Sequence, residues 1–175
     1  GHSTLVIDGE LQRAAGHSHV TSFSDSPQFP HTIVEMTDVY RGQVDSLRRG
    51  VALLPSGEVL IQDEIKGKPG SKIRWGMITQ SEPTKEGAAQ DIHLHERNRT
   101  LGMRLLGDND NGWQVLDASK PQNDWDSPNR GTSIVSFEAT VPEDGLVTLA
   151  VLATPGSCRK SVKDSVKIKT LDSWD

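Results

Sequence analysis

The sequence has one cysteine, few aromatic residues and no long apolar run. Among its 175 residues Cys158 is the single cysteine, so a disulfide within the chain is excluded. Phe, Trp and Tyr together make up 5% of the chain. Its apolar runs fall far short of the roughly 20 residues that a membrane-spanning helix needs. We therefore expect neither a disulfide-stapled scaffold nor a membrane partner.

An excess of positive charge is also lacking. Lys and Arg number 19 against 24 Asp and Glu, which gives a formal net charge of -5. Since nucleic acids are bound largely through Lys and Arg contacts to phosphate, we expect no nucleic acid among the partners. The length is enough for one globular domain spanning residues 1–175, which could bury roughly 70% of its unfolded surface.

Helical periodicity is absent, and alternation between apolar and polar residues takes its place along most of the chain. Glycine and proline turns separate the alternating segments. The pattern predicts an all-β fold, a large antiparallel β-sandwich of about eleven or more short strands. The expected strands are residues 2–8, 17–23, 31–40, 44–54, 58–65, 72–80, 91–96, 100–106, 112–118, 132–141 and 146–154.

The turn at residues 55–57, Pro-Ser-Gly, fixes one hairpin register. With Gly57 in the left-handed conformation, Leu54 pairs with Glu58, and counting outward places Arg49 opposite Asp63. Both charged residues interrupt an otherwise apolar stripe. Because a lone buried charge is costly, we expect a structural ion pair between Arg49 and Asp63. The alternative is that each side chain reaches solvent or bonds elsewhere.

Other turns predict further hairpins. Arg41-Gly42 and Pro69-Gly70 each separate two expected strands, and residues 142–145 separate the strands 132–141 and 146–154. We expect a hairpin at each of these places.

Two regions lack clear alternation. Residues 107–131 are rich in Asn, Asp, Gly and Pro, and predict a long surface loop around one strand. Trp113 and Trp125 are its main large apolar residues, and we consider both as candidates for stacking on a sugar ring. Residues 155–175 carry several lysines and predict a basic tail or an edge strand.

Two His-x-His pairs, at positions 17–19 and 93–95, lie on expected strands, so each pair shares one face. Such spacing can bind a metal, and the first pair could be joined by Asp25 or Asp38. At the second pair Glu96 follows directly and points to the opposite face. The alternative for both pairs is a strand histidine with no ligand.

Motifs for catalysis are missing. There is no Gly-x-Ser-x-Gly, and we assign no catalytic residue. Arg97 and Arg99 are expected to alternate on one strand face, where their guanidinium groups could bind the carboxylates or sulfates of an acidic glycan. The alternative is a solvated face balanced by neighbouring acidic residues.

The opening segment carries a family resemblance. Residues 2–9, His-Ser-Thr-Leu-Val-Ile-Asp-Gly, with Gln12 after them, resemble the "His-Asn-Thr, apolar strand, Asp-Gly, Gln" segment of the heparinase II/III-like polysaccharide lyases. The segments 38–40, 48–64 and 75–79 look like the successive strands of that family's C-terminal β-domain. The resemblance therefore covers about residues 2–80.

The resemblance implies a fold and an activity for a longer protein. Members of that family join an N-terminal α/α toroid to a β-sandwich, and cleave uronic-acid-containing polysaccharides such as glycosaminoglycans or alginate by β-elimination. It implies that this chain is the sandwich, with the toroid absent, and that the protein is periplasmic or secreted. It also implies a zinc site for which His2 supplies one ligand, the other ligands being upstream.

Two functions are consistent with the sequence. In the first, the chain is the C-terminal β-domain of such a lyase, forms one side of its cleft, and lacks the catalytic base and acid. In the second, it is a stand-alone, non-catalytic carbohydrate-binding or cell-surface sandwich that uses Trp113, Trp125 and nearby loops. Exposed tryptophans would favour the second. Whether the chain alone is an enzyme is not decided by the sequence.

Overall fold

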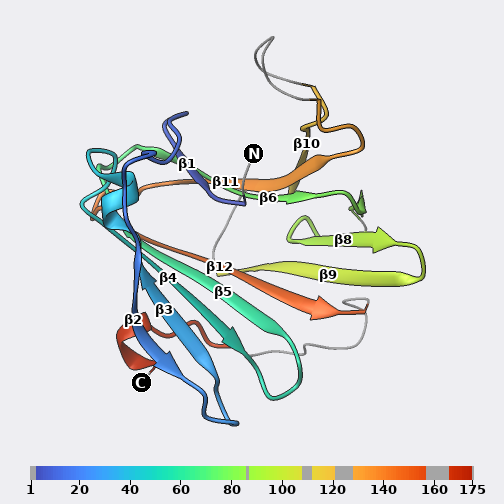
Figure 1. Ribbon diagram of the computed structural model, residues 1–175, viewed down its shortest axis with the longest axis horizontal. Helices are drawn as coiled ribbons and strands as arrows, with labels where there is room; N and C mark the ends of the chain where they lie inside the picture. Colours follow the sequence, from blue (N-terminus) through green and yellow to red (C-terminus); the bar gives the residue numbers. More distant parts are fainter. Residues whose placement is uncertain (1–2, 86, 108–111, 121–127, 157–165, 175) are drawn as a thin grey trace.

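The computed structural model describes residues 3–85, 87–107, 112–120, 128–156 and 166–174, and it is nearly all β (Figure 1). Two antiparallel sheets face each other, as the alternating pattern predicts. Neither of the two short 3-10 helices in these ranges is long and apolar enough to cross a membrane. The strands are β1 (Leu5–Ile7), β2 (His19–Ser24), β3 (His31–Glu35), β4 (Ser46–Leu53), β5 (Val59–Lys66), β6 (Lys72–Thr79), β7 (Glu82–Thr84), β8 (Asp91–Glu96), β9 (Arg99–Leu106), β10 (Gln114–Asp117), β11 (Ser133–Thr140) and β12 (Leu146–Pro155).

The two sheets differ in size. The smaller has four strands in the order β1-β6-β11-β10, and the larger has eight in the order β2-β3-β4-β5-β12-β9-β8-β7. Figure 1 shows the smaller sheet across the top of the molecule, with β2, β3 and the β4–β5 hairpin extending away from it. The smaller sheet therefore lies over only part of the larger one.

The β4–β5 hairpin has the register that its turn predicts. Gly57 has φ 97°, and the Leu54 amide donates to the Glu58 carbonyl at 2.8 Å. Glycine adopts this left-handed backbone conformation without the steric penalty that a Cβ would bring. Leu53 then pairs with Val59, and Arg49 with Asp63. The three-residue turn is thus sufficient to set the whole hairpin.

The expected strand over residues 31–40 is wrong in its second half. β3 ends at Glu35, and a 3-10 helix, η1, spans Thr37–Tyr40. The Glu35 carboxylate accepts a hydrogen bond from the Thr37 amide at 2.8 Å, which draws the backbone into a turn. Such local side-chain bonds compete with strand pairing. β3 and β4 do pair, but through this helix and not through a tight turn at Arg41-Gly42.

Two further predicted hairpins are also wrong. The segment around Pro69-Gly70 and the segment 142–145 each carry the chain from one sheet to the other, because β5 and β12 belong to the larger sheet and β6 and β11 to the smaller. The two connections bond to each other, since the Gly67 amide donates to the Gly145 carbonyl at 2.9 Å and the Gly70 amide to the Val141 carbonyl at 2.9 Å. The alternation of apolar residues is the same whether the next strand in the chain pairs with it in one sheet or lies in the opposite sheet. It therefore does not distinguish a hairpin from a connection between sheets.

The main core lies between the sheets. Trp75, Trp113 and Phe137 pack against one another, with ring centroids 5.4 to 5.9 Å apart. Around them lie buried aliphatic side chains from both sheets, such as Ile73 of β6 and Val151 of β12. Alternate positions of the facing strands supply this core, which is the reason the period of two is visible in the sequence.

A second core lies on the outer face of the larger sheet. There Ile33, Ala52 and Leu60 pack against Leu171 and Trp174. Leu171 belongs to a short 3-10 helix, η2 (Leu171–Ser173). Of the basic tail or edge strand expected over residues 155–175, the edge strand is wrong for residues 166–174, which cover the sheet without joining it. Their apolar residues are too few to show a periodicity.

Candidate functional site

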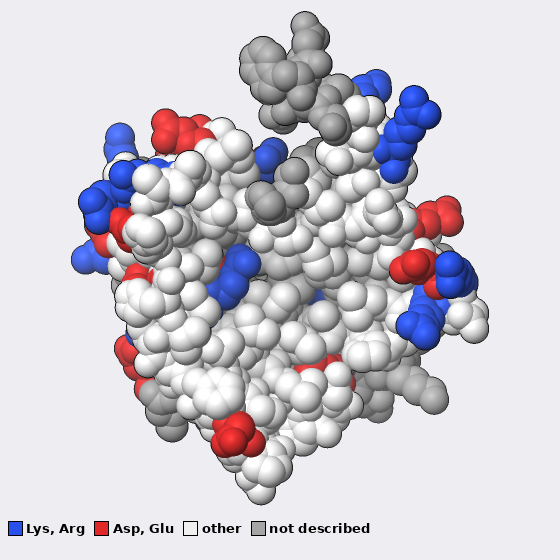
Figure 2. All heavy atoms as spheres, viewed as in Figure 1, with Lys and Arg blue, Asp and Glu red and all other residues white. Residues whose placement is uncertain are grey.

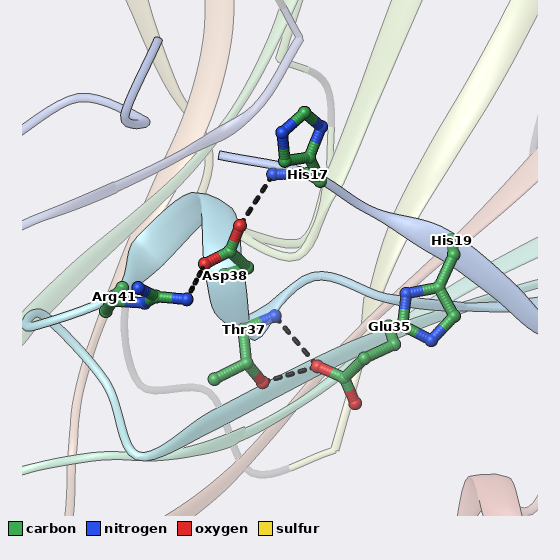
Figure 3. A pocket seen from close by; sticks show the side chains of 6 residues that line it. All are labelled: His17, His19, Glu35, Thr37, Asp38 and Arg41. Atoms are coloured by element: carbon green, nitrogen blue, oxygen red, sulfur yellow. Dashed lines mark hydrogen bonds and ion pairs between the residues drawn. The ribbon is translucent and has the colours of Figure 1, made fainter. Parts of the chain in front are cut away.

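A pocket of about 460 Å³ lies between the start of β2 and the η1 helix (Figure 3). Its lining comes from two neighbouring segments, His17 and His19 on one side and residues 35–41 on the other. The lining residues are His17, His19, Glu35, Thr37, Asp38 and Arg41. The bend of the chain from β3 into η1 thus brings titratable groups of both signs to one place.

Asp38 holds this arrangement together. Its Oδ2 accepts a hydrogen bond from the His17 amide at 2.9 Å, and its Oδ1 lies 2.5 Å from Arg41 Nη2 and 3.9 Å from Arg13 Nη1. The bond from the His17 amide, helped by the charges of Arg41 and Arg13, lowers the pKa of the Asp38 carboxyl. Both of its oxygens are therefore engaged by the chain itself.

The structure brings together three of the four residues suggested as metal ligands near the first His-x-His pair. His17, His19 and Asp38 line the pocket, whereas Asp25 does not. Across the described ranges, however, no group of three or more His, Cys, Asp or Glu side chains is placed to hold a metal ion. The pocket is thus a mixed polar site, with Glu35 as its second carboxylate.

The second His-x-His pair is occupied by protein contacts. The rings of His93 and His95 stack with centroids 6.3 Å apart. His95 Nε2 lies 2.9 Å from the Thr84 hydroxyl, and its Nδ1 lies 3.2 Å from the Thr100 hydroxyl. His93 is buried in β8. This pair joins β7, β8 and β9, and its contacts are structural.

The predicted ion pair between Arg49 and Asp63 is present. Arg49 Nε donates to Asp63 Oδ1 at 2.7 Å and Nη2 donates to Oδ2 at 2.9 Å, a bidentate geometry. The Asp63 side chain is fully buried and that of Arg49 is 18% exposed. Desolvation acts to lower the pKa of Arg49, but the Asp63 carboxylate outweighs it and the pKa is raised. The guanidinium therefore stays charged inside the sandwich.

Tyr40 completes this polar cluster, and the sequence does not reveal its role. Its hydroxyl lies 2.6 Å from Thr4 Oγ1, accepts from the Leu5 amide at 3.1 Å and lies 3.1 Å from the Leu5 carbonyl. Burial raises the pKa of the Tyr40 phenol. Tyr40 thereby fixes the start of β1 against η1, beside Arg49. A tyrosine at the end of an apolar stretch gives no signal of this in the sequence.

Trp113 is wrong as a sugar-stacking residue. Its side chain is 2% exposed, and its indole N–H donates to the Gln90 carbonyl at 2.8 Å. The ring packs edge-on against Trp75 and Phe137 in the main core. A loop rich in polar residues needs an apolar anchor, and Trp113 is that anchor. Trp125, the second candidate for sugar stacking, and His2, the expected zinc ligand, lie outside the described residues.

Arg97 and Arg99 do not share a strand face as expected. Arg97 has φ 55° and lies with Asn98 in the two-residue turn between β8 and β9, and Arg99 is the first residue of β9, paired with Glu96. Since the turn interrupts the strand, alternation does not apply across it. Both side chains are exposed, so they belong to a charged hairpin tip.

Comparisons with known proteins support the fold. No protein-family model and no curated protein sequence matches the chain. Among solved structures, it is similar to the heparan sulfate lyase HepC from Pedobacter heparinus, with a TM-score of 0.72 and 12% identity over 91% of this chain. It is also similar to a heparinase III, with a TM-score of 0.69 and 15% identity over 91% of this chain.

The match occupies a small part of each of those proteins. The chain spans 25% of the length of HepC and 24% of the length of the heparinase III. The two sheets described above therefore correspond to one region of a much longer molecule. The fold of this chain is that of a heparinase-like β-domain.

Proposed function

We propose that this chain is the C-terminal β-domain of a heparinase II/III-like lyase that acts on uronic-acid-containing polysaccharide by β-elimination. The observation that carries the proposal is the extent of the structural match, which takes in 91% of this chain and only a quarter of HepC. The heparinase-like sequence at residues 2–9 supports it independently.

In this proposal the chain is structural and forms one side of the glycan cleft. The general base that removes the C5 proton and the general acid that protonates the leaving oxygen belong to the rest of the protein. The chain alone is then inactive. The acidic polysaccharide and the N-terminal toroid are its partners, and the whole protein is periplasmic or secreted.

Zinc enters the proposal through His2 alone. The described residues do not fit a zinc site, because they contain no group of three or more suitable side chains in place to bind a metal. A zinc ion in the longer protein would therefore need its remaining ligands from another part of that protein.

The stand-alone carbohydrate-binding alternative has lost its main support in the described part of the chain. It depends on open tryptophan faces, and Trp113 is buried. The pocket around Asp38 offers polar groups but no aromatic platform.

The test is an activity comparison between two proteins. The first is residues 1–175, and the second is the full product of the gene that encodes them. Both are incubated with glycosaminoglycans, alginate and related uronans, and ultraviolet absorbance of the unsaturated product is followed. We expect activity from the longer protein and none from residues 1–175. Activity of residues 1–175 would refute the structural role, and a gene without a toroid would refute the family assignment.

A further inference from the structure

One half of the larger sheet's inner face is uncovered, and the strand register shows which half. Directly paired residues of antiparallel strands point to the same face. One row of such pairs crosses five strands, and its exposure falls from 71% at Phe23 on β2 to 0% at Val151 on β12. The row is Phe23, Thr32, Val51, Ile61 and Val151.

Two parallel rows show the same gradient. In one, exposure falls from 59% at Val20 on β2 to 4% at Leu149 on β12. In the other, it falls from 48% at Leu53 to 0% at Met103. The rows are Val20, Val34, Arg49, Asp63 and Leu149, and Leu53, Val59, Ala153 and Met103. The smaller sheet therefore covers β12, β9 and the Leu47–Ile65 end of β4 and β5, and leaves β2, β3 and the turn end of the β4–β5 hairpin open.

The uncovered residues form one apolar surface, which we call the open apolar face. It consists of Val20, Phe23, Thr32, Val34, Val51, Leu53, Val59 and Ile61, all exposed or half-buried. In the view of Figure 2, which looks onto the region where β3, β4 and β5 lie in Figure 1, most charged side chains lie towards the edges, and only small blue and red patches interrupt the uncharged middle. Contiguous exposed apolar surface of this kind marks an interaction site.

The outer face of the same strands makes the contrast clear. There the side chains of Ile33, Ala52 and Leu60 are buried beneath Leu171 and Trp174. Each of the strands β3 to β5 thus carries apolar side chains on both of its faces. Such a pattern is typical of strands whose two faces are both covered. The outer cover is present in the described residues, whereas the inner cover extends over only part of these strands.

We propose that the open apolar face is the surface on which the remaining, upstream part of the longer polypeptide docks. This inference depends on the proposed function, which supplies that longer polypeptide, and the matched structures show its size, since about three quarters of HepC lies outside the match. Thr4, the residue before β1, lies with its hydroxyl 2.6 Å from the hydroxyl of Tyr40 in η1. In the proposed longer polypeptide the chain would enter this domain beside η1, the helix that connects β3 to β4.

The chemistry of the docking surface follows from its residues. Arg49, which lies in the same row as Val20 and Val34, is already bound by both oxygens of Asp63. An acidic partner would gain little there, because the guanidinium charge is satisfied. The surface of the partner is therefore apolar, and the contact is stabilised by burial of Phe23, Val20 and Leu53.

The experiment compares backbone amide exchange in residues 1–175 with that in the longer protein. We expect amides of β2 and β3 to exchange at least about tenfold more slowly in the longer protein, since docking suppresses local opening of an edge strand. Phe23→Ser in the longer protein should remove most of that protection. Leu146→Ser is the matched control, because Leu146 is 58% exposed and lies outside the open face.

The possible results separate this inference from the proposed function. Equal exchange in the two proteins, with lyase activity in the longer one, would overturn the docking surface and leave the function intact. Slower exchange without lyase activity would support the surface and overturn the function. A dimer of residues 1–175 that Phe23→Ser dissociates, with no added protection in the longer protein, would make a second copy the occupant and overturn the inference. Thermal unfolding of each variant confirms that it is folded.

Discussion

The two faces of strands β3 to β5 are covered in different ways. On the inner face a second sheet covers only part of these strands, around Leu47 and Ile65, and the buried polar side chains there are paired, as Arg49 is with Asp63. On the outer face the cover is a short segment, residues 166–174, with a small apolar cluster of its own. The comparison teaches that a sheet can be closed by a whole layer or by a few well-placed side chains.

The outer cover depends on a few specific contacts. The Gln62 side-chain amide donates to the Lys169 carbonyl at 2.7 Å, and the Leu171 amide donates to Glu64 Oε1 at 2.7 Å. Gly50 leaves the space that the cover fills, because a Cβ there would lie 2.5 Å from the Leu171 side chain. A short segment can therefore stay in place without strand pairing.

The inner face should be the more sensitive to loss of a single group. Asp63→Ala leaves the Arg49 charge unpaired inside the sandwich, and we expect it to lower the free energy of unfolding by about 3–5 kcal/mol. Urea unfolding followed by circular dichroism measures this. The control is the double variant Arg49→Met with Asp63→Leu, which should recover most of the loss. A single variant within about 1 kcal/mol of the parent would show that the pair is solvated.

The outer face should respond less strongly to the loss of one side chain. Leu171→Ala removes a fully buried side chain from the small cluster, and we expect a loss of about 3 kcal/mol from burial and cavity formation. The control is Leu11→Ala, since Leu11 is 66% exposed and its truncation should change stability by about 0.5 kcal/mol or less. Equal effects of the two variants would mean that the segment does not cover the sheet in solution.

The attachment of β1 offers a smaller test on the inner side. Tyr40→Phe keeps the ring and removes the hydroxyl that contacts Thr4 and Leu5. We expect stability to fall by about 1–2 kcal/mol, the usual cost of losing a buried hydrogen-bond partner. Amide exchange of Leu5 and Val6 should accelerate more than that of β5. No acceleration at β1 would show that Tyr40 does not hold this strand.

The smallest effect should be an acid response of the outer cover. The hydrogen bond and charge of Arg48 lower the pKa of Asp172 below its usual value of 3.8. A carboxyl with a lowered folded-state pKa stabilises above its unfolded pKa, and this contribution is lost as the pH falls through the folded value. We expect Trp174 fluorescence to report loosening of the segment below about pH 3.8. Asp172→Asn should abolish this pH-dependent contribution, and an unchanged titration would contradict the role of Asp172.

Much of the larger sheet could be predicted from the sequence, and the reason is local. The β4–β5 register follows from a three-residue turn with Gly57, and the pairing of Arg49 with Asp63 follows from that register. The crossing of the chain between sheets at residues 142–145 could not be predicted, since the alternation on each side is the same for a hairpin and a crossover. The Asp38 pocket depends on the Glu35 to Thr37 bond that ends β3, a contact without a periodic signal.

The two crossing connections also determine the order in which the molecule can fold. In the smaller sheet β6 lies between β1 and β11, strands that are far from it in the sequence, and β11 begins only at Ser133. Bringing such distant strands together loses chain entropy before their contacts contribute any stabilisation, so these contacts form slowly. During synthesis we expect the β4–β5 hairpin to form early, because its three-residue turn brings the two strands together locally. The smaller sheet, and with it the main core, must wait until nearly the whole domain has left the ribosome.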